Sequence, residues 1–570
     1  AGRRRAMLPS RSIEHIERAV GLVGGGASGS LLDSKSRDEF AHCLSRYDTQ
    51  TRHLKELTIQ DVSAVVEGQG LAAPGRGARL DGGVDQPFID TLDKRDAVAR
   101  AEASTPPAPA HDRSASDVAP SAGSTAGADG DAAAAAAPRE QQVPCKNYSS
   151  MNECPDDMNL THELLNKLVI LRLNGGLGTS MGCKGPKSAI EVRNSLSFLD
   201  MAVSQVEYLN AKHLVDVPLL LMNSFNTDEE TKRLLSRYEE RRVTIRTFRQ
   251  SSFPLINKGT LRPLAKDKLT PETQGLWYPP GHGDVFTTLA RCGLLQQLIS
   301  MGKEYIFISN IDNLGATVDL NILYDIMEND YKFCMEVTKR ERQDVHGGTL
   351  VEQEGKPLLL EMSAISKYMA DMLRRDKRFD KFNTNNLWVS LRNLQKLVSV
   401  KRSLDLPVIL REKTARDGNG EEVNCLMFET AAGSAISLFE NSCVLVVPRA
   451  RFLPVKTTDD LFAVQSDLFT VKHGSLRLSE KRTISPPVPT VKLGPNFRTV
   501  EEYSKRLPFG VPDLLELEHL TVSGDVHFRN HVVLKGTVII VAEQGQHIDI
   551  CSGSVIRDKV ITGNLNILPH

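Results

Sequence analysis

After residue 142 the chain alternates short apolar runs with amphipathic stretches, and this alternation limits the possible fold more than any other feature. One stretch, between Phe198 and Leu209, places its apolar residues on a single helical face. Thr227 and Glu230 predict a capping box at the start of another helix. The predicted strands are Leu168–Leu173, Val217–Leu221, Val243–Phe248, Tyr305–Ser309 and Phe333–Val337. Strand and helix in repetition predict an α/β fold with a mostly parallel sheet, helices on both faces, and ligands at the carboxyl ends of the strands.

Three further parts of the chain differ from this pattern. Residues 1–67 have helical apolar spacing, which predicts an N-terminal helical segment. Residues 68–142 include a run of alanines and little bulky apolar surface, which predicts a disordered low-complexity linker. The large α/β unit is expected at 143–478. Residues 479–570 carry short apolar pieces interrupted by Gly524 and Gly536, which predicts a small all-β tail that could join copies of the chain into a homo-oligomer. Its apolar positions are Leu520, Val522, Val526, Phe528, Val532, Leu534, Val538 and Ile540.

Charge and cysteine usage exclude several classes of function. The chain has 70 Lys+Arg against 71 Asp+Glu, so no global field attracts nucleic acid or acidic membranes. Its 9 cysteines contain no C-x-x-C pair, which favours reduced thiols in the cytoplasm over a disulfide framework or a cysteine zinc site. No apolar run approaches the roughly 20 residues that a membrane span needs. We therefore expect a cytoplasmic protein.

The segment that carries the chemistry is LNGGLGTSMGCKGPKS, Leu173 to Ser188, directly after the first predicted strand. Its glycines let backbone N–H groups approach a ligand closely, while Lys184 and Lys187 bring positive charge to the same turn. A glycine-rich turn can also be only a tight connection. The spacing fits neither the dinucleotide fingerprint nor the P-loop, because Pro186 separates Gly185 from Lys187.

This segment resembles the nucleotide-binding loop of eukaryotic UDP-glucose pyrophosphorylases. The resemblance extends in order over about residues 160 to 540. The further segments that carry it are MNSFNTDEE (Met222–Glu230), FRQSSFP (Phe248–Pro254), WYPPGHGDVF (Trp277–Phe286), ISNIDNLGA (Ile308–Ala316), GGTL (Gly347–Leu350), FNTNNLWV (Phe382–Val389), ETAAGSAI (Glu429–Ile436), PRARFLPVKTTDDL (Pro448–Leu461) and LTVSGDV (Leu520–Val526).

The resemblance implies a Rossmann-like nucleotidyltransferase domain followed by a small left-handed β-helix. It also implies transfer of UMP from UTP to glucose 1-phosphate with Mg²⁺, giving UDP-glucose and pyrophosphate reversibly. The implied nucleotide-binding residues are Leu173, Asn174, Gly175, Gly176, Met222, Gln250 and Gly281. Those for the sugar and its phosphate are His282, Asn310, Gly348, Glu361, Asn383 and Asn385. Lys187 and Lys456 are the implied catalytic lysines, and Asp312 is the implied magnesium ligand.

The expected chemistry is in-line attack of the sugar phosphate on the α-phosphorus of UTP. The attacking oxygen is already an anion, so the protein has to neutralise and position charge rather than remove a proton. One alternative is a pyrophosphorylase for UDP-N-acetylglucosamine or for a broader range of UDP-sugars. Another is a catalytically idle UDP-sugar-binding scaffold, whose expected mark would be loss of Lys187, Lys456 or Asp312. All three residues are present.

Overall fold

The computed structural model describes Phe40, Cys43, Arg46 and residues 145–567, apart from 266–267, 342–343, 345–346, 354–355, 366, 402–403, 418–419 and 564–565. The predicted linker at 68–142 and nearly all of the predicted helical segment at 1–67 lie outside the described residues. Within the described part, no helix has the length and apolar character that crossing a bilayer requires.

A 10-stranded sheet forms the centre of the large unit. All neighbours along its main path are parallel except β14, which runs antiparallel to both β10 and β11. The hairpin of β12 (Gly348–Gln353) and β13 (Lys356–Glu361) joins it through β14. The main path is β1 (Cys145–Asn147), β17 (Ser442–Val446), β11 (Phe333–Lys339), β14 (Lys381–Ser390), β10 (Tyr305–Asn310), β2 (Leu168–Asn174), β5 (Leu219–Asn223) and β6 (Ile245–Arg249).

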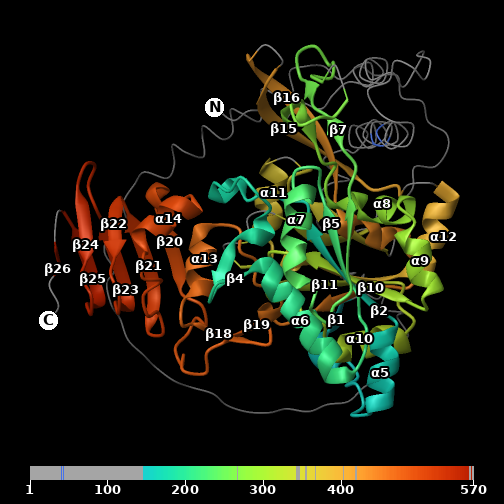
Figure 1. Cartoon of the computed structure of the whole chain (residues 1–570), viewed down its shortest axis with the longest axis horizontal. Helices are drawn as coiled ribbons and strands as arrows, with labels where there is room; N and C mark the ends of the chain where they lie inside the picture. Colours follow the sequence, from blue (N-terminus) through green and yellow to red (C-terminus); the bar gives the residue numbers. More distant parts are fainter. Residues whose placement is uncertain are drawn as a thin grey trace, which may run out of the picture. The chain divides into compact units, whose positions relative to one another are not determined.

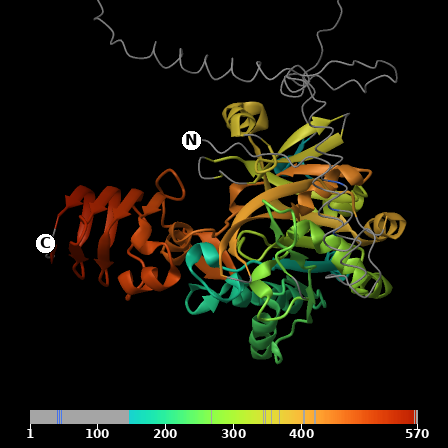
Figure 2. The same cartoon turned by 90° about the horizontal axis from the view of Figure 1, so that it is seen from above.

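Helices cover both faces of this sheet, as the alternation predicted (Figures 1 and 2). Successive side chains of a strand point to opposite faces, so β2 contributes to two separate cores. Val169 and Leu171 pack with α8 (Val285–Arg291), α9 (Leu294–Ser300) and α12 (Leu391–Lys401). Leu168 and Ile170 pack with α5 (Met158–Asn166), α6 (Phe198–His213) and α10 (Leu320–Glu328). A strand buried on both sides has no polar face, which explains the apolar run from Leu168 to Leu171.

The predicted capping box at Thr227 is wrong, although the helix begins where expected. Thr227 is the N-cap of α7 (Asp228–Leu235), but its side chain accepts no hydrogen bond from the first turn of the helix. Its hydroxyl donates to the carbonyl of Asn174, at 2.9 Å, and accepts from the N–H of Ser224. The hydroxyl therefore ties α7 to the end of β2.

A smaller sheet lies beside the large one, and Phe40 packs against it. It consists of β15 (Val408–Arg416), β16 (Glu422–Thr430) and β8 (Ile256–Asn257), all antiparallel. Phe40 is fully buried against it, with its ring centroid 4.8 Å from that of Phe253 and 6.2 Å from that of Phe428. Phe40 therefore belongs to the hydrophobic core of the sheet.

The C-terminal part is built from two parallel sheets of short strands (Figure 1). One contains β20 (Thr490–Leu493), β21 (Leu517–Ser523), β23 (Val533–Val541) and β25 (Val555–Thr562). The other contains β22 (Asp525–Phe528), β24 (His547–Ile550) and β26 (Asn566–Ile567). The eight apolar positions predicted from the sequence are all buried. The predicted all-β tail contains a short helix between β20 and β21, α14 (Val500–Arg506), that the sequence analysis missed.

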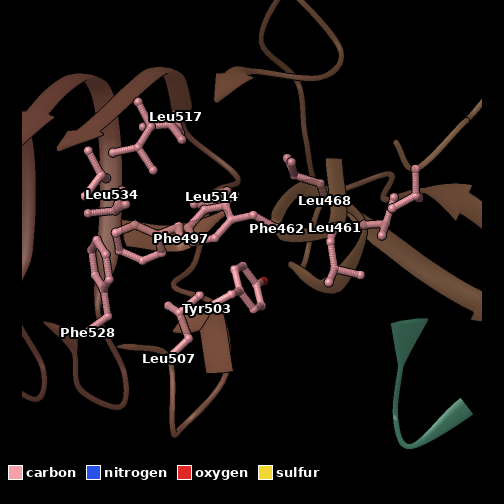
Figure 3. Close-up of a cluster of buried hydrophobic side chains, with 14 of the residues drawn as sticks. Leu461, Phe462, Leu468, Phe497, Tyr503, Leu507, Leu514, Leu517, Phe528 and Leu534 are labelled. Atoms are coloured by element: carbon pink, nitrogen blue, oxygen red, sulfur yellow. The ribbon is translucent and has the colours of Figure 1, made fainter. Parts of the chain in front are cut away.

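One hydrophobic core joins these two sheets, referred to below as the C-terminal coils, to the large unit (Figure 3). Phe462 of α13 (Thr458–Gln465) lies with its ring centroid 6.5 Å from that of Phe528 in β22. Met181 and Ile190, which flank the end of the glycine-rich segment, belong to the same core.

The remaining strands and α-helix are β3 (Glu191–Arg193), β4 (Leu196–Ser197), β7 (Phe253–Pro254), β9 (Trp277–Tyr278), α11 (Lys367–Arg375), β18 (Phe469–Lys472) and β19 (Ser475–Leu478).

Candidate active site

Polar residues collect at one edge of the large sheet, where its parallel strands end. Asn174, Asn223 and Asn310 end β2, β5 and β10, and these three strands are adjacent and parallel. Because β14 runs the other way, its first half reaches the same edge. The side-chain amide of Asn385 in β14 donates to Asn310 Oδ1 at 3.0 Å. The structure therefore brings the predicted nucleotide residue Asn174 and the predicted sugar residues Asn310 and Asn385 to a common edge.

The glycine-rich segment forms a closed loop at this edge. The N–H of Lys187 donates to the carbonyl of Gly176, at 3.2 Å, and Leu177 pairs with Pro186 in an isolated antiparallel bridge. A Cβ at Gly175 would lie 2.2 Å from Gln250 Nε2, so a side chain there would displace this amide. The loop thus brings bare backbone against the side-chain amide of Gln250.

A buried hydrogen-bond network anchors the start of the loop to the neighbouring strand and helix. The amide of Asn174 donates to Asn223 Oδ1 at 2.8 Å and to Thr231 Oγ1 at 2.9 Å. The hydroxyl of Ser224 donates to the carbonyl of Gly175 at 2.7 Å. The Asn174 side chain is therefore engaged with the scaffold, which leaves the backbone of the loop to face a ligand.

Gln250 lies next to the loop with one polar atom unused. Its N–H donates to the carbonyl of Asn223 at 2.9 Å, and the residue is 7% exposed. Its Oε1 is buried and finds no hydrogen-bond partner among the described residues. Leu173 and Met222, paired in register across β2 and β5, are buried at the base of the same region. A buried, unpaired amide oxygen costs free energy unless a ligand donates to it.

The two predicted catalytic lysines and the predicted magnesium ligand meet at Asp312 Oδ2. Lys187 Nζ lies 2.7 Å from Asp312 Oδ2, and Lys456 Nζ lies 2.9 Å from the same oxygen. The Lys187 and Asp312 side chains are nearly buried, whereas that of Lys456 is 53% exposed. Lys184, the other lysine of the loop, is exposed. Two ammonium groups therefore converge where the loop, the end of β10 and the segment before α13 meet.

The lysines control the ionisation of Asp312. Burial acts to raise the pKa of Asp312, but the charges and hydrogen bonds of Lys456 and Lys187 outweigh burial and hold the pKa at about 2. The second oxygen, Oδ1, is buried and has no hydrogen-bond partner among the described residues. An ionised carboxylate with a free oxygen fits a hard cation such as Mg²⁺, which prefers oxygen ligands.

The segment that carries Lys456 is fixed by a buried ion pair that the sequence analysis did not single out. The N–H of Val455 donates to the carbonyl of Asp312 at 3.1 Å, which joins the two segments directly. Arg451, five residues before Lys456, donates to both oxygens of Glu336 in β11, each at 2.7 Å. The indole of Trp388 donates to Glu336 Oε1 at 2.9 Å.

His282 lies beside the site in a neutral form. Burial lowers the pKa of His282 to about 4, and the charges of Lys456 and Arg411 act in the same direction. Its Nδ1 accepts from the N–H of Ala432 at 3.0 Å, so the neutral ring carries its proton on Nε2. Gly281 has φ +87°, and a Cβ there would lie 2.5 Å from the carbonyl oxygen of Thr430.

The other predicted sugar residues line the strands next to Asn310. Gly348 pairs with Glu361 across β12 and β13, and burial raises the pKa of Glu361. Asn383 Oδ1 accepts from the N–H of Asn385 at 2.9 Å. A Cβ on Gly433 would lie 2.9 Å from Asn383 Nδ2 and 2.7 Å from Leu359 Cδ2. Gly433, in the segment ETAAGSAI, therefore has no room for a side chain between Asn383 and Leu359.

Comparison with known proteins identifies the family. Residues 127–535 match the profile of the family described as "UTP--glucose-1-phosphate uridylyltransferase". The chain belongs to this uridylyltransferase family. A probable UTP–glucose-1-phosphate uridylyltransferase of Schizosaccharomyces pombe is 47% identical over 76% of this chain and 83% of its own length. The UTP–glucose-1-phosphate uridylyltransferase of Saccharomyces cerevisiae is 48% identical over 74% of this chain and 83% of its own.

Solved structures show the same architecture. A UDP-glucose phosphorylase from Trypanosoma brucei has a TM-score of 0.64 at 35% identity, over 73% of this chain and 92% of its own. A mutant UDP-glucose pyrophosphorylase from Leishmania major, in complex with UDP-glucose, has a TM-score of 0.66 at 34% identity, over 74% of this chain and 89% of its own. As a member of the uridylyltransferase family, the chain is an enzyme that uses UTP and glucose 1-phosphate.

Proposed function

We propose that the transfer takes place at the edge that holds Lys187, Asp312 and Lys456. A phosphate oxygen of glucose 1-phosphate would attack the α-phosphorus of UTP, in line with the pyrophosphate that leaves, to give UDP-glucose. The observation that carries this proposal is the convergence of both lysines on one oxygen of Asp312. Lys187 lies 125 positions before Asp312 in the sequence, and Lys456 lies 144 positions after it.

The reaction brings two polyanions together and builds charge on the leaving group. At roughly 4 Å and an effective dielectric near 20, one lysine–phosphate pair is worth about 4 kcal/mol before desolvation. Lys187 is held rigidly by burial, whereas Lys456 is exposed and able to reach an incoming phosphate. We assign Lys187 and Lys456 to positioning and neutralising the phosphates.

We propose that Asp312 holds Mg²⁺ through its free oxygen, Oδ1. Magnesium commonly takes one or two carboxylates, substrate phosphates and water. When bound, the ion supplies further positive charge to the phosphates. The support is the ionised, half-satisfied carboxylate of Asp312.

For the substrates we propose that Gln250 Oε1 accepts from the uracil and that the backbone of the glycine loop faces the nucleotide. The unpaired acceptor and the bare backbone at Gly175 support this. Half-buried His282 would donate through Nε2 to a phosphate or sugar oxygen. The amides and carboxylate of the neighbouring strands would pair with sugar hydroxyls, which rejects an epimer that leaves a partner unpaired. The implied sugar and phosphate contacts are His282, Asn310, Gly348, Glu361, Asn383 and Asn385.

Three wider proposals accompany this assignment. The two C-terminal parallel sheets would be faces of a left-handed β-helix, with the domain boundary at 478/479, directly after β19. Val555 and Val560 of β25 are 59% and 65% exposed, which supports the coils as a homo-oligomer surface. The free state of all nine cysteines supports a cytoplasmic location.

The test measures pyrophosphate release from UTP and glucose 1-phosphate with Mg²⁺. Lys187→Ala and Lys456→Ala should each lower kcat roughly 10²–10³-fold, the scale of losing one preorganised electrostatic group. Circular dichroism checks that the fold survives. The control, Lys472→Ala, removes an exposed lysine of β18 and should leave kcat within error. Near-normal turnover in either lysine variant would remove that lysine from the mechanism. Other sugar 1-phosphates in the same assay measure the breadth of specificity.

A further inference from the structure

Four side chains form a compact square on the outside of the C-terminal coils. Asp525 and His527 lie two residues apart on β22, so both face the same side of the strand. The parallel register places His547 of β24 beside Asp525 and Asp549 beside His527. Acids and imidazoles therefore alternate along and across the two strands. The side chains are between 24% and 42% exposed, so solvent reaches the square.

Three of these residues present ligand atoms to one point. One nitrogen of each histidine and a carboxylate oxygen of Asp525 all lie within 4.8 Å of one another. His527 Nε2 is 3.2 Å from Asp525 Oδ1, and His547 Nδ1 is 2.9 Å from Asp525 Oδ2. Ligands about 2.0–2.1 Å from a tetrahedral zinc ion lie roughly 3.3 Å apart. The two distances from Asp525 are close to that spacing, each to a different carboxylate oxygen, and the three ligand atoms of one set lie at most 4.8 Å apart.

The fourth residue supports this arrangement. Asp549 Oδ2 lies 2.9 Å from His547 Nε2, the ring nitrogen that does not face Asp525. A carboxylate on the far nitrogen of a metal-binding histidine fixes the orientation of the ring and raises its basicity. Asp549 is itself held by Arg529 Nη2 at 2.9 Å.

The surrounding charges set a limit on the strength of the site. Arg506 Nη2 lies 2.7 Å from Asp525 Oδ1, so one oxygen of Asp525 is already paired with a cation. Arg529 pairs with Asp549, and Arg506 is shared between Asp525 and Glu502, so these cations already offset much of the negative charge that a divalent ion would meet. Such a site binds more weakly than a closed, cysteine-rich structural site.

We propose that Asp525, His527 and His547 form a binding site for a divalent transition metal of the zinc class, with solvent at the remaining position. Two imidazoles and one carboxylate suit zinc rather than magnesium, which avoids nitrogen ligands. The ion would bridge β22 and β24 and hold adjacent coils together. This proposal is independent of the transfer reaction, because the square lies on other elements than the lysine and aspartate site.

The test titrates the full-length protein with Zn²⁺ by calorimetry at mildly alkaline pH, with excess Mg²⁺ present to occupy oxygen-only sites. His527→Gln and His547→Gln should each lose one equivalent of Zn²⁺ or bind it at least about tenfold more weakly. His519→Gln is the matched control, because His519 lies on β21 of the same coils and contacts Thr521. It should bind as the wild type does. UTP turnover and circular dichroism verify that each variant is folded.

Visible absorption of the Co²⁺-loaded protein separates this site from the thiols, because cysteine ligation adds a strong near-ultraviolet band. The wild type should show d–d bands without that band, and both histidine variants should lose them. Equal Zn²⁺ stoichiometry and affinity in the wild type and both variants would overturn the proposal. So would a Co²⁺ spectrum that is dominated by thiolate ligation.

Discussion

Arg451 donates to both carboxylate oxygens of Glu336, each at 2.7 Å, in the interior of the protein. The Glu336 side chain has no exposed surface, and that of Arg451 is 9% exposed. Glu336→Ala would leave the guanidinium buried without its main partner. We expect the free energy of unfolding to fall by about 3–5 kcal/mol, measured by urea denaturation. Arg233→Ala, which breaks the exposed pair with Glu230, is the control and should leave the denaturation midpoint unchanged. A change below about 1 kcal/mol in Glu336→Ala would contradict this prediction.

Gly175→Ala should weaken binding of UTP while leaving the fold intact. The added Cβ would lie 2.2 Å from Gln250 Nε2, and this flexible amide would have to turn away. Loss of the hydrogen bonds that the amide offers should raise the KM for UTP about tenfold, since such bonds contribute roughly 0.5–1.5 kcal/mol each. Gly185→Ala, in the same loop, meets nothing within 4 Å and serves as the control. An unchanged KM in Gly175→Ala would argue against Gln250 as a nucleotide contact.

His282 should make the fold less stable in mild acid. Burial lowers its pKa from 6.5 to about 4, so between these values the unfolded chain binds a proton that the folded chain does not. Its contribution to stability is therefore lost as the pH falls through this window, with a slope of at most about 1.4 kcal/mol per pH unit. His282→Gln should remove that slope from urea titrations at several pH values. Exposed His162→Gln should keep it. Identical pH dependence in the wild type and His282→Gln would disprove the prediction.

Asp312 should set the demand for magnesium. Chelation of divalent ions should stop pyrophosphate release, and added Mg²⁺ should restore it. Asp312→Asn keeps the shape but loses the charge, so it should need a higher Mg²⁺ concentration for half-maximal rate. The measurement is initial rate against Mg²⁺ concentration at saturating substrates. A wild-type Mg²⁺ curve for Asp312→Asn would show that the ion is held elsewhere.

The sequence predicted the central strands well where they are buried on both faces. For β2, β10 and β11 the predicted and observed starts coincide, because each of these strands begins with a run of apolar residues. β5 and β6 each begin two residues later than predicted, at Leu219 and Ile245. The apolar residues Val217 and Val243 precede the strands and misled the prediction. Apolar periodicity locates an element better than it locates its ends.

The sequence indicated which residues form the candidate site, but it did not indicate the buried contacts that hold those residues in place. Lys187, Lys456 and Asp312 came from motif resemblance, and the structure brings all three together. Glu336 lies 115 positions from Arg451 in sequence, and a lone glutamate in an apolar strand gives no sign of its partner. Thr227 looked like a local cap, yet its hydroxyl bonds across to Asn174. Long-range pairs of this kind are decided by packing, which local patterns do not contain.

The continuous core between the C-terminal coils and the glycine loop has a consequence for how such an enzyme can change. Gly182 of the loop has no room for a side chain, since a Cβ there would lie 2.6 Å from Thr499 Cγ2 at the start of α14. The tail is therefore no exchangeable accessory. In a chimera with the tail of a relative, the tail residues that contact the glycine loop would have to match those of this chain, or the loop would move. Selection for catalytic rate therefore also constrains residues that are far from any substrate.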